Sequence, residues 1–346
     1  MGPQYGEILR DHGFNPTPLR ALAGGALANL VPAGSHHGIV LLTLLDPLLE
    51  AGMFAAIAWA FGLNVMLLCM IYFCVLFGAS FGYTGGAYLR YMWLCELILS
   101  VCCVRRQHHV AAGVLLAWSA LLRIFPAFFV VPLACKAARS VAATHRVEPR
   151  YARFFVSFVT ASGVLFAITL TLPRGLEQWR EFTAKMSRHL ASDAYNTIGL
   201  TEILAYHGAT QPTTRAEFAS VTTRRARIHL VQWLTIFPLT LFFVARRCGR
   251  ENDSAAMAVG ILLIFTALSV ASYYYAFLLL LVLARARHLR DIVLLFATEA
   301  VAFSLTLFED REVVLYFYRN VLLSCLLVAL YVNGRTLRGA RGNQAG

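Results

Sequence analysis

An arginine within an apolar stretch is the residue of this sequence that most clearly predicts chemistry. Residues 119–129 read SALLRIFPAFF, which places Arg123 three positions before Pro126. A charged side chain in the hydrocarbon of a bilayer costs at least ~2.5 kcal/mol and indicates a function by default. A guanidinium can hold phosphate oxygens through two parallel hydrogen bonds. The pattern therefore predicts an anion-binding arginine at a break in a helix.

Two other interpretations of Arg123 stay open. The guanidinium could pair with an intramembrane carboxylate, for which Glu96 and Glu299 are the candidates, or it could extend to the membrane interface. Tyr273 and Tyr274 lie at a second break and have a similar alternative. They belong either to an interfacial aromatic belt or to the same external cavity as Arg123.

A polar segment at 174–228 supplies further candidate ligands. Its first part, 176–190, has apolar residues at helical spacing with charges between them, which predicts an amphipathic helix on a membrane surface. The next residues gather the donors and the carboxylate that could hold sugar hydroxyls or phosphate: Arg188, His189, Asp193, Tyr195 and Asn196.

Candidate acids and bases are few. Asp46 and Glu50 lie four apart on one helical face, as an acid–base pair or as structural partners, and Asp11 in RDHGFN is a candidate catalytic base. No catalytic triad, P-loop, H-E-x-x-H or dinucleotide fingerprint is present, so ATP-driven transport has no support in this sequence. The eight cysteines form no C-x-x-C pair. The sequence thus predicts neither a disulfide framework nor a metal site.

Composition indicates that a membrane domain must position these residues. Hydrophobic residues make up 59% of the chain and charged residues 14%, whereas a soluble domain has roughly 25% charged residues. The net charge of +12 comes from short basic stretches between apolar runs, which is typical of cytoplasmic loops rather than of a nucleic-acid surface. The sequence predicts an all-α, polytopic integral membrane protein whose partner is the lipid bilayer and not nucleic acid.

Two apolar segments are unsuited to a single crossing of the membrane. The expected membrane segments are 38–60, 63–82, 90–104, 110–134, 153–173, 229–245, 255–284, 291–308 and 316–333. As one helix, 255–284 would measure about 45 Å against a hydrocarbon core of ~30 Å, and SVASYYYAF interrupts it. Arg123 and Pro126 interrupt 110–134.

We expect each of these two segments to form a pair of short helices that doubles back. The basic stretches between the apolar segments then all face one side, and broken helices are tolerated where they line a cavity. Loop 174–228 carries basic residues of its own, so segment length and helix breakers favour this topology more than charge does.

The resulting topology divides the chain into three parts. Residues 1–37 form an external N-terminal segment, 38–333 form one transmembrane domain that includes the external loop 174–228, and 334–346 form a basic cytoplasmic tail. An external polar N-terminus with no preceding helix is unusual. The sequence therefore reads as one that lacks an upstream membrane segment.

The arrangement resembles the GT-C superfamily of polytopic glycosyltransferases. The resemblance covers most of 40–290 and is carried by GGAYLRYMWL (85–94), AGVLLAWSALLRIFPAFFVVPL (112–133), NTIGL (196–200) and SYYYAFLLLL (272–281). It is strongest to the branch that contains bacterial polyprenol-phosphate-mannose-dependent alpha-1,2-mannosyltransferases. It implies transfer of a mannose-like hexose or a pentose from a polyprenyl-phosphate donor to a glycan or glycolipid acceptor. The reaction would occur at the external face of a bacterial inner membrane, with no cofactor besides the donor.

The resemblance also implies roles for single residues. Arg123 would neutralise the leaving phosphate, while Arg188, His189, Asp193, Asn196, Tyr273 and Tyr274 would surround the donor phosphate and sugar. The family's base is a carboxylate in the first external loop, of which residues 1–37 resemble only the tail. The base is then either Asp11 or absent from this chain. The alternatives are a transporter or lipid-linked-sugar flippase, for which broken helices are also typical, and a noncatalytic scaffold.

Overall fold

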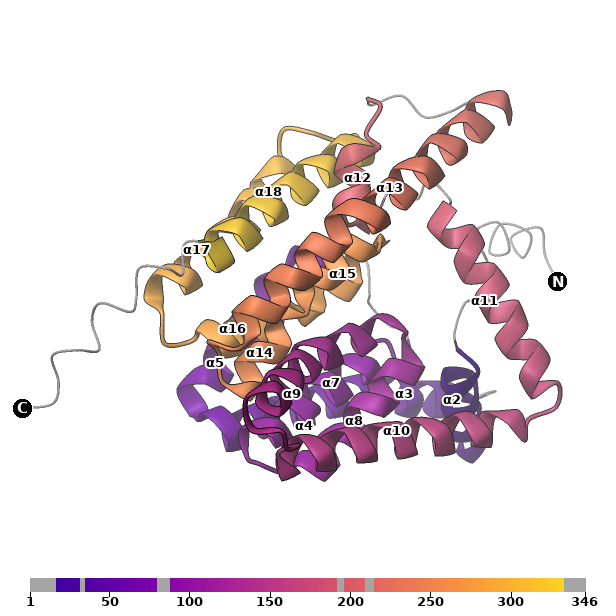
Figure 1. Cartoon of the computed structure of the whole chain (residues 1–346). Helices are drawn as coiled ribbons and strands as arrows, with labels where there is room; N and C mark the ends of the chain where they lie inside the picture. Colours follow the sequence, from indigo (N-terminus) through magenta and orange to yellow (C-terminus); the bar gives the residue numbers. More distant parts are fainter. Residues whose placement is uncertain (1–16, 32–34, 80–87, 192–195, 209–214, 333–346) are drawn as a thin grey trace, which may run out of the picture.

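The computed structural model describes residues 17–31, 35–79, 88–191, 196–208 and 215–332 (Figure 1). Regular structure in these residues is almost entirely helical, which confirms the all-α prediction. The helices that form the bundle are α2 (Pro18–Leu30), α3 (His36–Thr43), α4 (Leu45–Phe61), α5 (Leu63–Val75), α7 (Met92–Arg105), α8 (His109–Leu122), α9 (Val130–Thr144), α10 (Pro149–Leu170), α11 (Gly175–Ala191), α12 (Leu200–Leu204), α13 (Arg215–Cys248), α14 (Asp253–Val259), α15 (Ile261–Ala267), α16 (Leu279–Arg285), α17 (Leu289–Leu305) and α18 (Glu312–Val332).

Short 3-10 helices and two strands complete the structure. The 3-10 helices are η1 (Phe77–Ala79), η2 (Phe125–Phe129) and η3 (Ser272–Leu278), and the strands β1 (Thr197–Ile198) and β2 (Val270–Ala271) pair antiparallel. Within the described residues, five helical stretches are long and apolar enough to cross a membrane: His36–Phe61, Phe125–Thr144, Pro149–Leu170, Ser220–Cys248 and Glu312–Tyr331.

The break predicted in 110–134 is present at Arg123. Helix α8 ends at Leu122, Arg123 has an extended backbone, and η2 then leads into α9. Pro126 has no N–H with which to continue the hydrogen bonds of α8. The carbonyl of Leu122 instead accepts a hydrogen bond of 3.4 Å from the Thr17 hydroxyl, so the break in α8 is also where the start of α2 binds.

The chain doubles back at this break. Near the start of α8, a methyl group on Gly113 would lie 2.4 Å from the carbonyl oxygen of Phe154, close to the start of α10. At that same end, Lys136 of α9 and Arg150 of α10 both pair with Asp253. The start of α8 and the later part of α9 therefore lie together. Arg123 lies at the opposite end of this helix pair, at the tip where the chain turns.

The segment 255–284 doubles back in the same way. Helices α14 and α15 lead to an extended stretch at 268–271, after which η3 and α16 return alongside α14. The last carbonyls of α15 would lack partners at a helix end. They accept hydrogen bonds from α13, where Gln232 donates to Thr266 and Trp233 donates to Ala267 at 2.9 Å.

Ion pairs gather at the end of the bundle opposite the two tips, which we call the basic end. Asp253 accepts from Lys136 at 2.5 Å and from Arg150 at 3.1 Å, and Glu251 lies 2.9 Å from Arg247 and 3.3 Å from Arg285. These contacts bring three predicted basic stretches to one end, namely 136–153, 246–250 and 285–290. The stretch 105–106 directly precedes the start of α8, which lies at the same end. The fifth, 335–341, lies outside the described residues.

Two helices differ from the sequence prediction, one because it is longer than expected and one because no helix was expected there. Helix α13 has 34 residues where 229–245 was expected, and α2 forms within the segment expected to be the tail of an external loop. The amphipathic helix predicted at 176–190 is present as α11. It runs from the end of α10 towards the start of α13, on the side of the bundle where α2 lies (Figure 1).

The strand pair joins the second tip to the rest of the bundle. Gly199, directly after β1, lets the backbone of β1 pass close to the residues that precede β2. A Cβ at residue 199 would lie 2.3 Å from the carbonyl oxygen of Leu268. We expect Gly199→Ala to lower the free energy of unfolding by about 1–3 kcal/mol, because the clash involves backbone that cannot rotate away. Thermal unfolding in detergent would measure it, with Gly163→Ala as the control because a Cβ there meets open space. Equal stability of the two variants would contradict the prediction.

Candidate functional site

The two helix tips meet at a pair of arginines and a pair of tyrosines. The guanidinium carbon of Arg123 lies 5.0 Å from the ring centre of Tyr274, and that of Arg90 lies 4.4 Å from the ring centre of Tyr273. The two tyrosine rings are 4.3 Å apart. The structure thus brings together three residues that the sequence predicted, and it adds Arg90 to them.

Aromatic side chains form an apolar wall behind these charges. The ring of Phe125 lies 4.9 Å from Trp93 and 5.1 Å from Tyr274. The hydroxyl of Ser119 donates to the carbonyl of Trp93 at 2.7 Å, which fixes α8 to the start of α7. Arg123 is therefore presented on a packed surface and not on a free loop.

Arg20 of α2 is the third cation. Its guanidinium donates to the carbonyls of Tyr88 and Leu89 at 3.4 Å each. Burial, followed by the nearby positive charge of Arg123, lowers the pKa of Arg20 to about 10. We call Arg20, Arg90 and Arg123 the arginine cluster.

The carboxylate of Asp46 lies near the arginine cluster, but no guanidinium of the cluster is paired with a carboxylate among the described residues. None of its members forms an ion pair there, and the Nε atoms of Arg90 and Arg123 are buried without a hydrogen-bond partner. Buried charge is normally paired, because leaving it unpaired is costly. An anion bound between these guanidiniums would supply both the charge and the missing acceptors.

The carboxylates considered as partners of Arg123 are engaged elsewhere or form no ion pair with it. Glu299 accepts hydrogen bonds from the Tyr72 hydroxyl at 3.3 Å and from the backbone N–H of Phe77 at 3.1 Å. Glu96 has a buried carboxylate oxygen without a hydrogen-bond partner. Within the described residues, the alternative in which Arg123 is neutralised by an intramembrane acid is therefore not observed.

The other predicted site residues are placed only in part. Asn196 lies next to the second tip, where its carbonyl accepts from the backbone N–H of Ser272 at 2.7 Å. Arg188 and His189 belong to the last turns of α11, whose side chains lie outside the described part. Asp11, Asp193 and Tyr195 lie outside the described residues.

Arg20 and Arg90 are members of the cluster that sequence reasoning did not identify. Arg90 lies in the motif GGAYLRYMWL, but its single charge has no spacing that points to a ligand. Arg20 follows the helix-starting sequence TPL in a segment that was expected to be a loop tail. In the sequence, each of these arginines appears only as a basic residue directly before an apolar helix or within one. Basic residues that merely set the orientation of a membrane helix occupy the same positions, so sequence alone does not distinguish the two roles.

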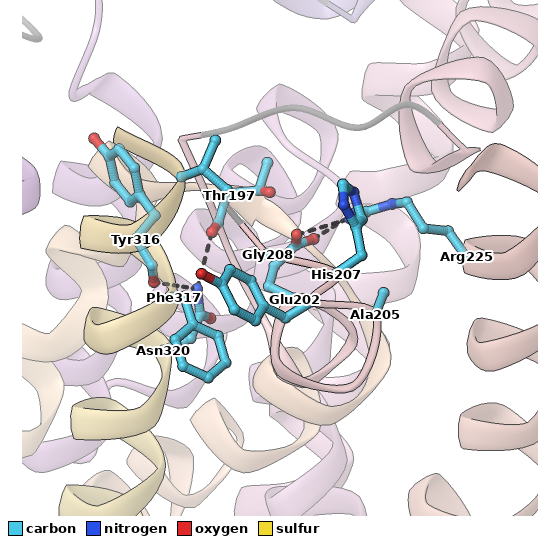
Figure 2. Close-up of a pocket in the computed structure, with 11 residues that line it drawn as sticks. Thr197, Glu202, Ala205, His207, Gly208, Arg225, Tyr316, Phe317 and Asn320 are labelled. Atoms are coloured by element: carbon cyan, nitrogen blue, oxygen red, sulfur yellow. Dashed lines mark hydrogen bonds and ion pairs between the residues drawn. The ribbon is translucent and has the colours of Figure 1, made fainter. Parts of the chain in front are cut away.

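A hollow beside β1 differs in its electrostatics from the arginine cluster (Figure 2). It is lined by Thr197, Glu202, Ala205, Tyr206, His207, Gly208, Arg225, Val313, Tyr316, Phe317 and Asn320. Here Glu202 binds both terminal nitrogens of Arg225, at 2.6 and 3.0 Å. Asn320 donates to the carbonyls of Thr197 and Tyr316. This arginine is neutralised by a carboxylate, so the hollow is a poorer anion site than the arginine cluster.

The described residues contain no group of three or more His, Cys, Asp or Glu that could hold a metal ion. Comparison of the chain with protein-family models, with curated proteins and with solved structures finds no significant match in any of the three. Its function is therefore inferred from its own residues.

Proposed function

We propose that this chain is an integral membrane glycosyltransferase of the GT-C kind, which takes a sugar from a polyprenyl-phosphate donor. The observation that carries the proposal is the arginine cluster, three guanidiniums without a carboxylate partner among the described residues, at the tips of two broken helix pairs. Broken helices at membrane depth occur where they line a cavity, and an anion there would balance the three clustered cations.

The length of α8 supports a site at membrane depth. Helix α8 has 14 residues and spans roughly 21 Å at 1.5 Å per residue, whereas a hydrocarbon core measures ~30 Å. Helix α10 has 22 residues, long enough to cross. With the basic end in the cytoplasm, Arg123 would lie beneath the external surface, where the phosphate of a lipid-anchored donor would also lie.

Exposed apolar faces support insertion into a bilayer. Val156 and Val159 of α10 are each 65% exposed, and Leu234 and Leu239 of α13 are each 69% exposed. Contiguous apolar surface of this kind is covered by lipid in a polytopic protein. We place the protein in a bacterial inner membrane on the strength of the family resemblance.

The chemistry of transfer explains why the cations should be unpaired. When the bond between the sugar C1 and the phosphate oxygen breaks, a phosphodiester with one negative charge becomes a phosphomonoester with two. Guanidiniums that are not already neutralised bind the second charge, so they stabilise the transition state more than the ground state. Tyr273, Tyr274, Asn196 and His189 would then contact the sugar, and attack by the acceptor hydroxyl from the opposite face inverts the anomeric centre. Asp11 remains the candidate base.

Turnover of defined donors tests the proposal. Purified protein in proteoliposomes would be given polyprenyl-phosphate mannose or a polyprenyl-phosphate pentose with a glycolipid acceptor, and both polyprenyl phosphate release and donor binding would be measured. We expect release, or binding alone if the base is missing, and a large loss of release in Arg123→Ala. Protein that neither binds nor turns over any such donor would refute the proposal. Movement of the intact donor between leaflets would indicate a flippase instead.

A further inference from the structure

We propose that Asp46 is a positioning residue of the anion site, which acts by holding the backbone that carries Arg90. This inference rests on the proposed function, because it assigns a role in binding the phosphate of the donor. The pair Asp46 and Glu50 was expected to be either an acid–base pair or structural partners. Among the described residues, only Asp46 of the two forms hydrogen bonds with its carboxylate, and both go to the turn at 88–91.

The carboxylate of Asp46 binds backbone rather than a cation. One of its oxygens accepts the backbone N–H of Arg90 at 3.0 Å, and the other faces the backbone N–H of Tyr91 at 3.4 Å. Asp46 lies in the first turn of α4, and the residues that it binds directly precede α7. Both oxygens thus accept hydrogen bonds from the turn at 88–91, which favours a structural role for Asp46 over a role as acid or base.

The turn at 88–91 needs such an anchor. Leu89 has φ of +52°, in the left-handed region that a residue with a Cβ adopts only when its surroundings hold it there. Arg20 supports the same turn through the carbonyls of Tyr88 and Leu89. The Tyr88 hydroxyl donates to the carbonyl of Gly24 at 3.1 Å. Asp46 from α4 and these contacts from α2 hold the turn from two helices.

The consequence is that Arg90 is oriented without being neutralised. A carboxylate bound to the guanidinium itself would occupy the hydrogen-bond donors that a phosphate needs. Bound to the N–H of Arg90, the same carboxylate fixes the Cα position from which the guanidinium reaches the ring of Tyr273. Arg225 shows the opposite arrangement, since Glu202 binds its guanidinium directly.

Glu50 provides the matched control. It lies one turn further along α4, has the same carboxyl group and forms no hydrogen bond to the turn at 88–91 among the described residues. A general effect of removing a carboxyl group from α4 would appear in Glu50→Ala as well as in Asp46→Ala. An effect through Arg90 would appear only in the latter.

A double-mutant cycle tests the inference in the purified full chain. Binding of farnesyl phosphate in detergent would be measured by calorimetry for wild type, Asp46→Ala, Arg90→Ala, the double variant and Glu50→Ala. We expect each of the two single variants to weaken binding about tenfold, the effect of one charge-assisted hydrogen bond. The double variant should bind as Arg90→Ala does, because Asp46 acts through Arg90, and Glu50→Ala should bind as wild type.

The possible failures are distinguishable. If Asp46→Ala binds like wild type, or if the two losses multiply in the double variant, the inference is wrong while the anion site stands. If wild type does not bind farnesyl phosphate, the proposed function fails and the inference fails with it. Thermal melting would confirm that each variant is folded. Asp46→Asn, which keeps one acceptor oxygen, replaces Asp46→Ala in the cycle if the latter unfolds.

Discussion

Arg123→Ala is expected to lower donor turnover by about 10²–10³-fold, which is the effect of removing one preorganised group that stabilises developing charge. Arg123 has no ion pair within the described residues, and its Nε is a buried donor without a partner. Removal of its charge therefore breaks no carboxylate contact there. The loss should appear in kcat more than in KM, because the phosphate gains its second charge only as the bond breaks.

Two variants make the Arg123 result interpretable. Arg311→Ala removes an exposed arginine that pairs with Glu309 at 2.7 Å, so it controls for a general loss of positive charge and should retain full turnover. Arg123→Lys keeps the charge and loses the planar pair of donors, so it should recover only part of the rate. Wild-type kcat in folded Arg123→Ala would show that this arginine does not contact the leaving phosphate.

Asp253→Ala is expected to lower the free energy of unfolding by about 3 kcal/mol, the lower end of the range for breaking a buried ion pair. Asp253 is 7% exposed, and its two oxygens pair with Lys136 at 2.5 Å and with Arg150 at 3.1 Å. It also accepts from the Tyr151 hydroxyl at 3.1 Å. Alanine would leave Lys136 without its anion at the point where α9, α10 and α14 meet, while Arg150 would keep Glu148 at 2.7 Å.

Unfolding in mixed detergent micelles, followed by circular dichroism, would measure this change. Glu177→Ala is the control, because Glu177 and its partner Arg174 are more than half exposed and such pairs contribute at most about 1 kcal/mol. A change of less than 1 kcal/mol in Asp253→Ala would mean that packing alone holds the basic end together. If the ion pairs of Asp253 hold α9, α10 and α14 together, Asp253→Ala should unfold under milder conditions than wild type.

The elements of this fold follow from local sequence because local physics determines them. Pro126 cannot donate the hydrogen bond that α8 would need, so a break beside Arg123 was predictable from 119–129 alone. A run as long as 255–284 exceeds the thickness of a membrane, which made a second break predictable as well. Apolar periodicity likewise located α11.

The composition of the site depended on contacts that no local pattern encodes. Arg20, Arg90 and Arg123 come from three separate segments, and they meet because Thr17 binds the carbonyl that Pro126 leaves free in α8 and because Asp46 binds the N–H of Arg90. Helix periodicity relates residues three or four apart, whereas these contacts join residues more than forty positions apart. Which cations lie close together, and which are neutralised as Arg225 is, depends on how the helices pack.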